Sequence, residues 1–396
     1  MERLQFSVLL SSRKSELGGL FCPVVVLIVL QHVIVLVSSL DARSAFLSEP
    51  SPPTLVVLGD STVDVGVNNR LVTLVKSNFP PYGRDFEHGI IKKQPTGRFC
   101  NGKIVPDYLA EKLGIPYPLA YTDPQATGTN ILQGINVASS GSGWYNSTAA
   151  TYNVKPLHEQ VEWVNEWQKK LVSVIGQEAA AMKVKEAVYI ISTGSNDWVN
   201  YYYTFPGVQS SYSKSNFRKM ILIDIANILQ LKSCIVYVKD QLLYGSGARR
   251  ILLTSLPPLG CIPSQITKYG EGTDRNCVSW IQDDVTTFNR ELEELIASLK
   301  NTLPEATLVM GDGFSITFDA FQNPAKYDLQ EVKKGCCGTG LYEVGLFCTT
   351  LQSDTTCRDA SHYLFWDSFH PSHYFNTILA EEVWQTIVKR FQLTVT

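Results

Sequence analysis

Five short apolar runs, separated by segments with a helical period, constrain the fold of this chain of 396 residues more than any other feature. The runs are rich in aliphatic and β-branched residues, which is typical of buried strands. They cover residues 54–58, 134–138, 187–192, 250–254 and 306–310. Strands that alternate with helices predict right-handed crossovers and a parallel sheet with helices on both faces. We therefore expect an α/β fold, a three-layer α/β/α sandwich around a parallel five-stranded sheet.

The spacing of apolar residues between these runs predicts the helices of the sandwich. Such residues recur at intervals of three and four positions over 157–174 and again over 281–299. A further helix is indicated by Pro106 near its start and Gly114 just past its end.

The N-terminal part of the chain differs from the rest in composition. Residues 20–40 are apolar or uncharged and follow a basic segment, which is typical of a secretory signal. The run approaches the roughly 20 residues that can span a bilayer, so a retained membrane anchor is the alternative to cleavage. We expect residues 1–45 to be a signal peptide or signal anchor with its connector, on a secreted protein. No internal repeat and no second Ser/Pro-rich linker follow, so residues 46–396 are predicted to form a single domain.

Charge and composition restrict the partners. The chain has 34 basic and 37 acidic residues, a formal charge of -3, so it lacks the basic excess typical of a nucleic-acid surface. Asn146 begins the triplet Asn-Ser-Thr, which is an acceptor for an N-glycan on the secretory route. We expect no stable membrane partner unless the N-terminal segment is retained as an anchor.

Cysteine usage agrees with secretion. Removal of a leader that contains Cys22 leaves an even number of cysteines, which in a secreted protein predicts disulfides. They are Cys100, Cys234, Cys261, Cys277, Cys336, Cys337, Cys348 and Cys357. The adjacent pair Cys336 and Cys337 does not have zinc-ligand spacing, which favours disulfides over a metal site. Cys100 and Cys234 are either unpaired or bonded to each other.

Ser61 stands in "TLVVLGDSTVDVG", where an apolar run ends abruptly in Gly-Asp-Ser. The serine is thus expected just past the end of a strand, and ligands of open α/β sheets bind outside the carboxyl ends of the strands. This position makes Ser61 a candidate nucleophile. Asp60 and Asp64 are expected to brace the turn.

A serine nucleophile needs a neighbouring base, usually a histidine that a carboxylate orients. The segment "SHYLFWDSFHPSHYFN" has Asp367 three residues before His370, a spacing that puts both side chains on the same side of one turn. We predict that His370 is the base and Asp367 its orienting carboxylate. His362 and His373 are regarded as structural neighbours.

Two later strand ends offer donors for an oxyanion. Gly141, in "VASSGSGW", lets the backbone N–H approach a ligand because glycine has no side chain. Asn196, in "ISTGSNDW", follows a glycine turn and can point its amide into the same crevice. Three candidate elements therefore follow three successive strands, and the candidate base lies near the C-terminus.

These segments resemble the four signature motifs of the SGNH hydrolase superfamily, and specifically of its plant GDSL esterase/lipase family. The motifs read "GDSTVDVG", "GINVASSGSG", "GSND" and "DSFHP". The stretches "PYGRDF", "PTGRFCNGK", "GARRILLTSLPPLGCIP" and "GCCGTG" also resemble that family, so the likeness extends from Thr54 to the C-terminus. Val67 stands where the family usually has asparagine, and Ser140 where glycine or alanine is common. The resemblance implies a flavodoxin-like SGNH hydrolase fold.

The resemblance also implies a role for each residue. Ser61 attacks the ester carbonyl, and His370, oriented by Asp367, takes the serine proton and later gives it to the leaving alcohol. The backbone N–H groups of Ser61 and Gly141 and the amide of Asn196 form the oxyanion hole. Because an activated serine needs only the base and these donors, we expect no metal and no organic cofactor.

Three functions are compatible with these residues. The first is a secreted serine esterase or lipase that hydrolyses a small-molecule, lipid or carbohydrate ester through an acyl-enzyme. The second is an acyltransferase in which an alcohol or sugar hydroxyl replaces water at the same site. The third is a non-catalytic binding protein that keeps the fold, a reading that the intact set of residues disfavours.

Overall fold

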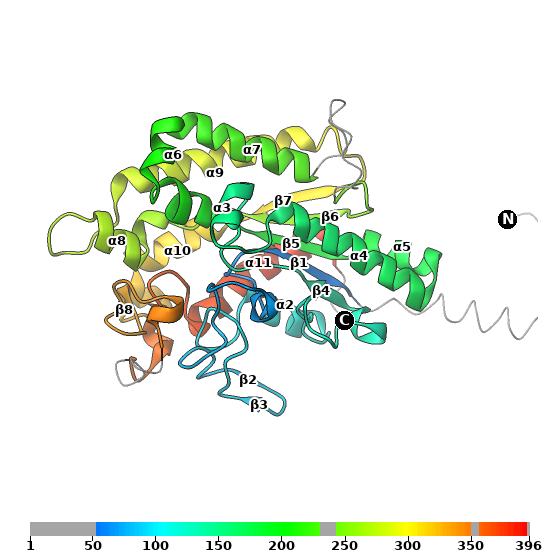
Figure 1. Cartoon of the computed structure of the whole chain (residues 1–396), viewed down its shortest axis with the longest axis horizontal. Coiled ribbons are helices and arrows are strands. Elements are labelled where there is room, and N and C mark those ends of the chain that lie inside the picture. Colours follow the sequence, from blue (N-terminus) through cyan, green and yellow to red (C-terminus); the bar gives the residue numbers. More distant parts are fainter. Residues whose placement is uncertain (1–52, 230–242, 350–355, 394–396) are drawn as a thin grey trace, which may run out of the picture. The chain divides into compact units, whose positions relative to one another are not determined.

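A five-stranded parallel sheet forms the centre of the fold (Figure 1). The computed structural model describes residues 53–229, 243–349 and 356–393. Along the sheet the strands are β4 (Gly134–Asn136), β1 (Leu55–Gly59), β5 (Val188–Ser192), β6 (Arg250–Thr254) and β7 (Thr307–Gly311). Each lies within a residue or two of a predicted apolar run, and all neighbouring pairs are parallel. The predicted α/β fold with a parallel five-stranded sheet is confirmed.

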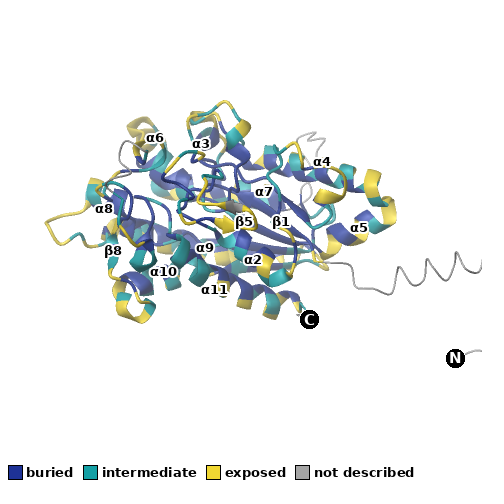
Figure 2. Cartoon of the chain, turned by 90° about the horizontal axis from the view of Figure 1, so that it is seen from below, coloured by how far each residue is buried: buried dark blue, intermediate teal, exposed yellow. Residues whose placement is uncertain are grey.

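Strand β1 is apolar on both faces because both faces are covered. Leu55 pairs with Gly134 on one side and with Val188 on the other, and the side chains from Leu55 to Leu58 are 0% exposed. Successive side chains of a strand point to opposite faces, so Val56 and Leu58 belong to one hydrophobic cluster and Leu55 and Val57 to a second. Figure 2 shows β1 and β5 as buried elements between partly exposed helices.

The helices divide between the two faces of the sheet. Helices α4 (Leu157–Ile175), α7 (Lys214–Leu229) and α9 (Ser279–Leu299) share a hydrophobic cluster with one face. Helices α2 (Val105–Leu113) and α11 (His373–Phe391) share a cluster with the other. The three layers agree with the predicted sandwich.

The predicted helices are found at the predicted positions. α4 and α9 match the two amphipathic segments, and α2 ends at Leu113, directly before Gly114, which has a φ of +65°. The apolar pattern did not single out α7 and α11. The other α-helices and strands of the described chain are α3 (Asn146–Thr151), α5 (Gln177–Glu186), α6 (Pro206–Ser211), α8 (Pro263–Tyr269), α10 (Gly313–Gln322), and the strand pairs β2 (Glu87–His88) with β3 (Ile91–Lys92) and β8 (Glu331–Gly335) with β9 (Tyr363–Phe365).

Disulfides link the cysteines outside the sheet. The bonds are Cys261–Cys277, Cys336–Cys357 and Cys337–Cys348, so the expectation of disulfides is confirmed. Cys100 is buried with a free thiol. The predicted leader and Cys234 lie outside the described residues. Within the described ranges, no helix is long and apolar enough to cross a membrane.

Candidate active site

Ser61 lies in the tight turn that follows β1. The turn depends on Gly59, whose φ is +140° and where a Cβ would lie 2.0 Å from the carbonyl oxygen of Ser192. Gln160 of α4 holds this glycine, accepting from its N–H at 2.8 Å and donating to its carbonyl oxygen at 2.9 Å. The strand therefore stops where only glycine fits, and the Ser61 hydroxyl is presented at the carboxyl edge of the sheet.

Two buried carboxylates brace the serine turn. Asp60 accepts from the backbone N–H and the hydroxyl of Thr62, at 3.0 and 2.8 Å. Asp64 accepts from the backbone N–H of Val67 at 2.7 Å and from the N–H and hydroxyl of Ser140 at 3.0 and 2.7 Å. Burial raises the pKa of Asp60 to about 6 and also raises the pKa of Asp64. Ser140, a departure from the family pattern, thus adds a hydroxyl contact between the serine and glycine motifs.

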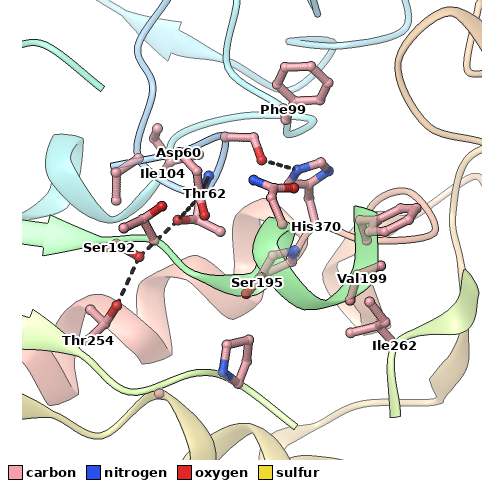
Figure 3. Close-up of a pocket in the computed structure, with 18 of the residues that line it drawn as sticks. Asp60, Thr62, Phe99, Ile104, Ser192, Ser195, Val199, Thr254, Ile262 and His370 are labelled. Carbon is pink, nitrogen blue, oxygen red and sulfur yellow. Dashed lines mark hydrogen bonds between the residues drawn. The ribbon is translucent and has the colours of Figure 1, made fainter. Parts of the chain in front are cut away.

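His370 joins Ser61 to Asp367 across 309 positions of sequence. Its Nε2 lies 2.8 Å from the Ser61 Oγ, and its Nδ1 lies 2.8 and 2.9 Å from the two carboxylate oxygens of Asp367. Figure 3 shows the imidazole of His370 in the pocket, with a hydrogen bond drawn to one of its ring nitrogens. Ser61 is 9% exposed, His370 7% and Asp367 0%. In this geometry the carboxylate fixes a proton on Nδ1, which leaves Nε2 free to accept the serine proton.

The carboxylate of Asp367 is itself held by three further donors. One oxygen accepts from the backbone N–H groups of Phe369 and His370, at 2.9 and 2.7 Å. The other accepts from the hydroxyl of Tyr82 at 2.8 Å. Burial and the neighbouring carboxylate raise the pKa of Tyr82 well above its usual value. The sequence reasoning did not single out Tyr82, and its position inside "PYGRDF" was the only signal for it.

The predicted oxyanion donors belong to Ser61, Gly141 and Asn196, which line one cavity. Within the described chain, the backbone N–H groups of Ser61 and Gly141 have no hydrogen-bond partner. Asn196 donates one amide hydrogen to the carbonyl oxygen of Ser142 at 2.8 Å, and its oxygen accepts from Asn200 at 2.6 Å. These bonds fix which way the amide faces. Because an amide nitrogen carries two hydrogens, one remains for a ligand.

Another buried carboxylate, that of Asp197, joins the glycine motif to the asparagine motif. Asp197 accepts from the backbone N–H of Trp144 at 2.8 Å and from the hydroxyl of Thr148 at 2.6 Å. A Cβ at Gly143 would lie 2.1 Å from this carboxylate, so the contact requires glycine there. Burial raises the pKa of Asp197 to about 7. Asp197 therefore sets the distance between the loop of Gly141 and Asn196.

A cavity of about 670 Å³ opens onto these groups. Ser61, Gly141, Asn196 and His370 all line it, with Asp367 behind the imidazole. Its remaining wall is mostly apolar: Leu74, Val75, Phe99, Ile104, Val199, Leu256, Leu259, Ile262, Phe347, Phe369 and Leu379 are among the lining residues. Figure 3 labels Ile104, Ser192 and Thr254 on one side of His370, and Val199 and Ile262 on the other.

The hydroxyls on the cavity floor are already bonded to one another. Thr254 donates to Ser192 at 3.1 Å, and Thr62 donates to Asp60 at 2.8 Å. The 2.9 Å contact between the Ser192 and Thr62 hydroxyls therefore has Ser192 as its donor. Every hydroxyl hydrogen of this row has an acceptor within the protein, so the row does not require a polar substrate group.

The other residues named from the sequence lie away from this constellation. The Nδ1 of His373 accepts from the backbone N–H of Lys103 at 2.9 Å, and the Nδ1 of His362 lies 2.9 Å from the carbonyl oxygen of Asp328. Asn146 is exposed at the first residue of α3. The described residues contain no group of three or more His, Cys, Asp or Glu side chains placed to hold a metal ion.

The fold and the site together define a class of protein. A serine, a histidine and an aspartate are in hydrogen-bond contact at the carboxyl edge of a parallel sheet, near three N–H donors that have no partner within the described ranges. This arrangement is suited to acyl transfer.

Comparison with known proteins gives the family. The GDSL-like lipase/acylhydrolase family matches residues 55–383. The chain is 39% identical over 337 residues to the GDSL esterase/lipase At5g03820 of Arabidopsis thaliana, which covers 85% of this chain and 91% of that protein. It is also 39% identical over 329 residues to the GDSL esterase/lipase APG of Arabidopsis thaliana, covering 83% and 89%. The chain therefore belongs to the GDSL lipase/acylhydrolase family of carboxylic ester hydrolases.

Proposed function

We propose that this protein is a secreted serine esterase that hydrolyses carboxylic esters through an acyl-enzyme intermediate. The observation that carries the proposal is the contact of 2.8 Å between the Ser61 Oγ and the His370 Nε2, with Asp367 on the other ring nitrogen. An ordinary serine hydroxyl is a weak nucleophile, and a base in contact with it supplies the activation that ester cleavage needs.

The residues would act in two steps. The Ser61 Oγ attacks the ester carbonyl carbon while His370 takes the serine proton, and the carbonyl oxygen becomes an oxyanion. As the oxyanion collapses, the bond to the alcohol oxygen breaks and His370 protonates that oxygen. Water then attacks the acyl-enzyme, gives a proton to His370, and Ser61 regains its proton as the acid leaves.

The oxyanion would be stabilised by donors that are already in place. The N–H groups of Ser61 and Gly141 have no partner among the described residues, and the Asn196 amide is held by Ser142 and Asn200. Fixed donors of this kind need no reorganisation when charge develops, and each is worth about 3 to 4 kcal/mol in the transition state.

The cavity supports an ester with a substantial apolar part. Its volume of about 670 Å³ lies within the range of roughly 300 to 1,000 Å³ that is typical of small-molecule sites. The apolar walls and the internally bonded hydroxyl row favour aliphatic or aromatic groups over sugars in direct contact with the floor. The named relatives are esterases or lipases, which agrees with such a substrate.

Secretion is part of the proposal. The apolar segment 20–40 supplies the leader, within the proposed leader and connector 1–45, and residues 46–396 form the hydrolase domain. The disulfides are expected of a protein made in an oxidising compartment, and exposed Asn146 is available for a glycan. Sequencing the N-terminus of the protein from both the medium and the membrane fraction tests this. We expect a shortened N-terminus in the medium, whereas an intact N-terminus on a membrane-bound form would favour the anchor.

A serine-directed fluorophosphonate and a panel of esters test the chemistry. We expect the purified protein to be labelled and to hydrolyse esters, and Ser61→Ala to abolish both. Ser246→Ala is the matched control, because this serine does not line the cavity. Absence of labelling in the folded wild type would leave a non-catalytic binding protein. A competing alcohol that captures most of the acyl group would instead identify an acyltransferase.

A further inference from the structure

Tyr82 occupies a position that the mechanism above does not use. It lies 285 residues before Asp367 in the chain, is 1% exposed, and donates its hydroxyl hydrogen to the Asp367 Oδ2 at 2.8 Å. The other oxygen of Asp367 is held by two backbone N–H groups. Apart from His370, Tyr82 is the only donor to Oδ2 among the described residues.

The same hydroxyl contacts the wall of the substrate cavity. It accepts from the backbone N–H of Gly345 at 2.8 Å. Gly345 belongs to residues 344–347, here termed the lip segment, all of which line the cavity. Within it Leu346 is 50% and Phe347 72% exposed, and the disulfide Cys337–Cys348 anchors its end. A chain of hydrogen bonds therefore runs from the lip segment through Tyr82 to Asp367, His370 and Ser61.

Aromatic packing prevents Tyr82 from adjusting freely. Its ring lies edge-on to those of Phe79, Phe99 and Trp366, with centroid distances of 5.8, 5.5 and 6.3 Å. Phe99 also contacts the imidazole of His370, at a centroid distance of 4.9 Å. The phenol is thus fixed in a buried cluster that touches both the base and its carboxylate.

We propose that Tyr82 is a positioning residue for ester hydrolysis, which holds the carboxylate of Asp367 against His370 and links its position to that of the lip segment. The inference rests on the proposed serine-esterase function. A hydroxyl that accepts one hydrogen bond becomes a stronger donor in the next, so an ordered lip segment strengthens the bond from Tyr82 to Asp367.

The proposal fixes the sign of a pH effect. A donor on Asp367 disperses the carboxylate charge and weakens its stabilisation of the His370 imidazolium. Removing that donor therefore strengthens the ion pair between Asp367 and the protonated imidazole that forms during the reaction, and we expect the acid limb of kcat/KM to move to higher pH. Asp60 and the Cys100 thiol also face this pair, but they are the same in every variant, so a difference between variants reports on Tyr82.

The experiment compares Tyr82→Phe with Tyr189→Phe in the mature protein, as it is recovered after secretion. Tyr189 is 0% exposed and its hydroxyl donates to the carbonyl oxygen of Val184, so the control loses a buried hydroxyl away from the site. We expect kcat/KM at neutral pH to fall by about 10- to 100-fold in Tyr82→Phe, the range for a hydrogen bond to a charged group. The acid limb should move to higher pH in this variant alone. A loss of equal size at every pH would overturn the proposal, because it would indicate a merely structural role.

A second replacement guards against simple misfolding. Incorporation of 3-fluorotyrosine at position 82 keeps the ring and makes the hydroxyl a stronger donor, so the acid limb should move to lower pH. A shift in the same direction as that of Tyr82→Phe, or no shift, would contradict the proposal. If wild type neither hydrolyses esters nor reacts with fluorophosphonate, the proposed function itself has failed, which is a different result.

The link to the lip segment is tested by a double-mutant cycle. Replacing Cys337 and Cys348 by serine frees the end of the segment, and we expect the acid limb to move to higher pH as in Tyr82→Phe. In the Tyr82→Phe background the same replacement should cause no further shift. Additive shifts would mean that the lip segment acts independently of Tyr82.

Discussion

The two halves of the site are held in place by different means. In the strand half, Ser61, Gly141 and Asn196 follow β1, β4 and β5, and the buried carboxylates Asp64 and Asp197 tie their turns together. In the histidine half, residues 331–349 and 356–372, the described chain is mostly irregular, and two disulfides and long-range hydrogen bonds fix it. The strand half consists of loops that directly follow strands of the sheet. The histidine half is held mainly by disulfides and by hydrogen bonds to distant parts of the chain.

Because the two halves are held by different interactions, the stability of each half depends on a different solution condition. Carboxylates buried in the strand half make its stability depend on pH, because ionisation in an apolar setting is unfavourable. Disulfides make the histidine half depend on the redox state of the solution. Activity requires both halves, since the proposed nucleophile belongs to one and the proposed base to the other.

The largest expected effect on kcat comes from removing the proposed nucleophile of the strand half or the proposed base of the histidine half. Ser61→Ala and His370→Ala should each lower kcat by about 10⁴-fold or more, as for residues that act as a unit. The double variant should be no worse than either single variant, because each single change already disables the pair. Steady-state hydrolysis of a soluble ester measures this, with circular dichroism to establish folding. Wild-type-like turnover in either variant would show that the halves do not act together.

The next effect is confined to the strand half. Asn196→Ala removes a proposed oxyanion donor and should lower kcat by about 10²- to 10³-fold with little change in KM. Asn196→Asp keeps the size but not the donor, and should behave in the same way. Parallel measurement of kcat and KM for the two variants tests this; a change in KM alone would assign Asn196 to substrate binding instead.

The strand half could be derived from the sequence because its determinants are local. Each apolar run ends in glycine or small polar residues, and chemistry at parallel strand ends follows from topology alone. The placement of Ser61, Gly141 and Asn196 around one cavity needs only the strand order, since β1 lies between β4 and β5.

The histidine half could be derived only in part. The three-residue spacing of Asp367 and His370 is local, but the contact with Tyr82 joins positions 285 residues apart and no local pattern indicates it. Disulfide connectivity was open because Cys336 and Cys337 are adjacent and bond to different partners, Cys357 and Cys348. The spacing of apolar residues does not predict helix α11, because this helix packs against both α2 and β9 and its apolar residues are not confined to one narrow face.

Loss of a disulfide should destabilise the histidine half without destabilising the strand half. Replacing Cys336 and Cys357 by serine removes a closure of 21 residues and should lower the free energy of unfolding by about 3 kcal/mol. Faster amide hydrogen exchange should be confined to the histidine half, with β1 and β5 unchanged, and ester hydrolysis should fall. The control replaces Cys261 and Cys277, which lie outside the histidine half. Equal exchange in both halves would mean that they unfold as one unit.

The smallest effect is a pH dependence of stability in the strand half. The pKa of Asp60 is raised by burial from 3.8 to about 6, so the folded state binds a proton more tightly than the unfolded state. Stability from this group is full below about pH 4 and is lost as pH rises to about 6, by of order 2 kcal/mol. Asp60→Asn removes the charge, while the amide oxygen of the asparagine can still accept from Thr62. The stability of this variant should therefore fall less than that of the wild type between about pH 4 and pH 6.

Chemical denaturation at several pH values between 4 and 7 measures this difference. Asp283→Asn is the matched control, because Asp283 is exposed on α9 and should leave the pH dependence of the wild type unchanged. At pH 7 we expect Asp60→Asn to be more stable than wild type, although the turn that carries Ser61 loses a carboxylate. A steeper pH dependence in Asp60→Asn would mean that the ionised carboxylate stabilises the turn, and the strand half would then depend on charge in the opposite sense.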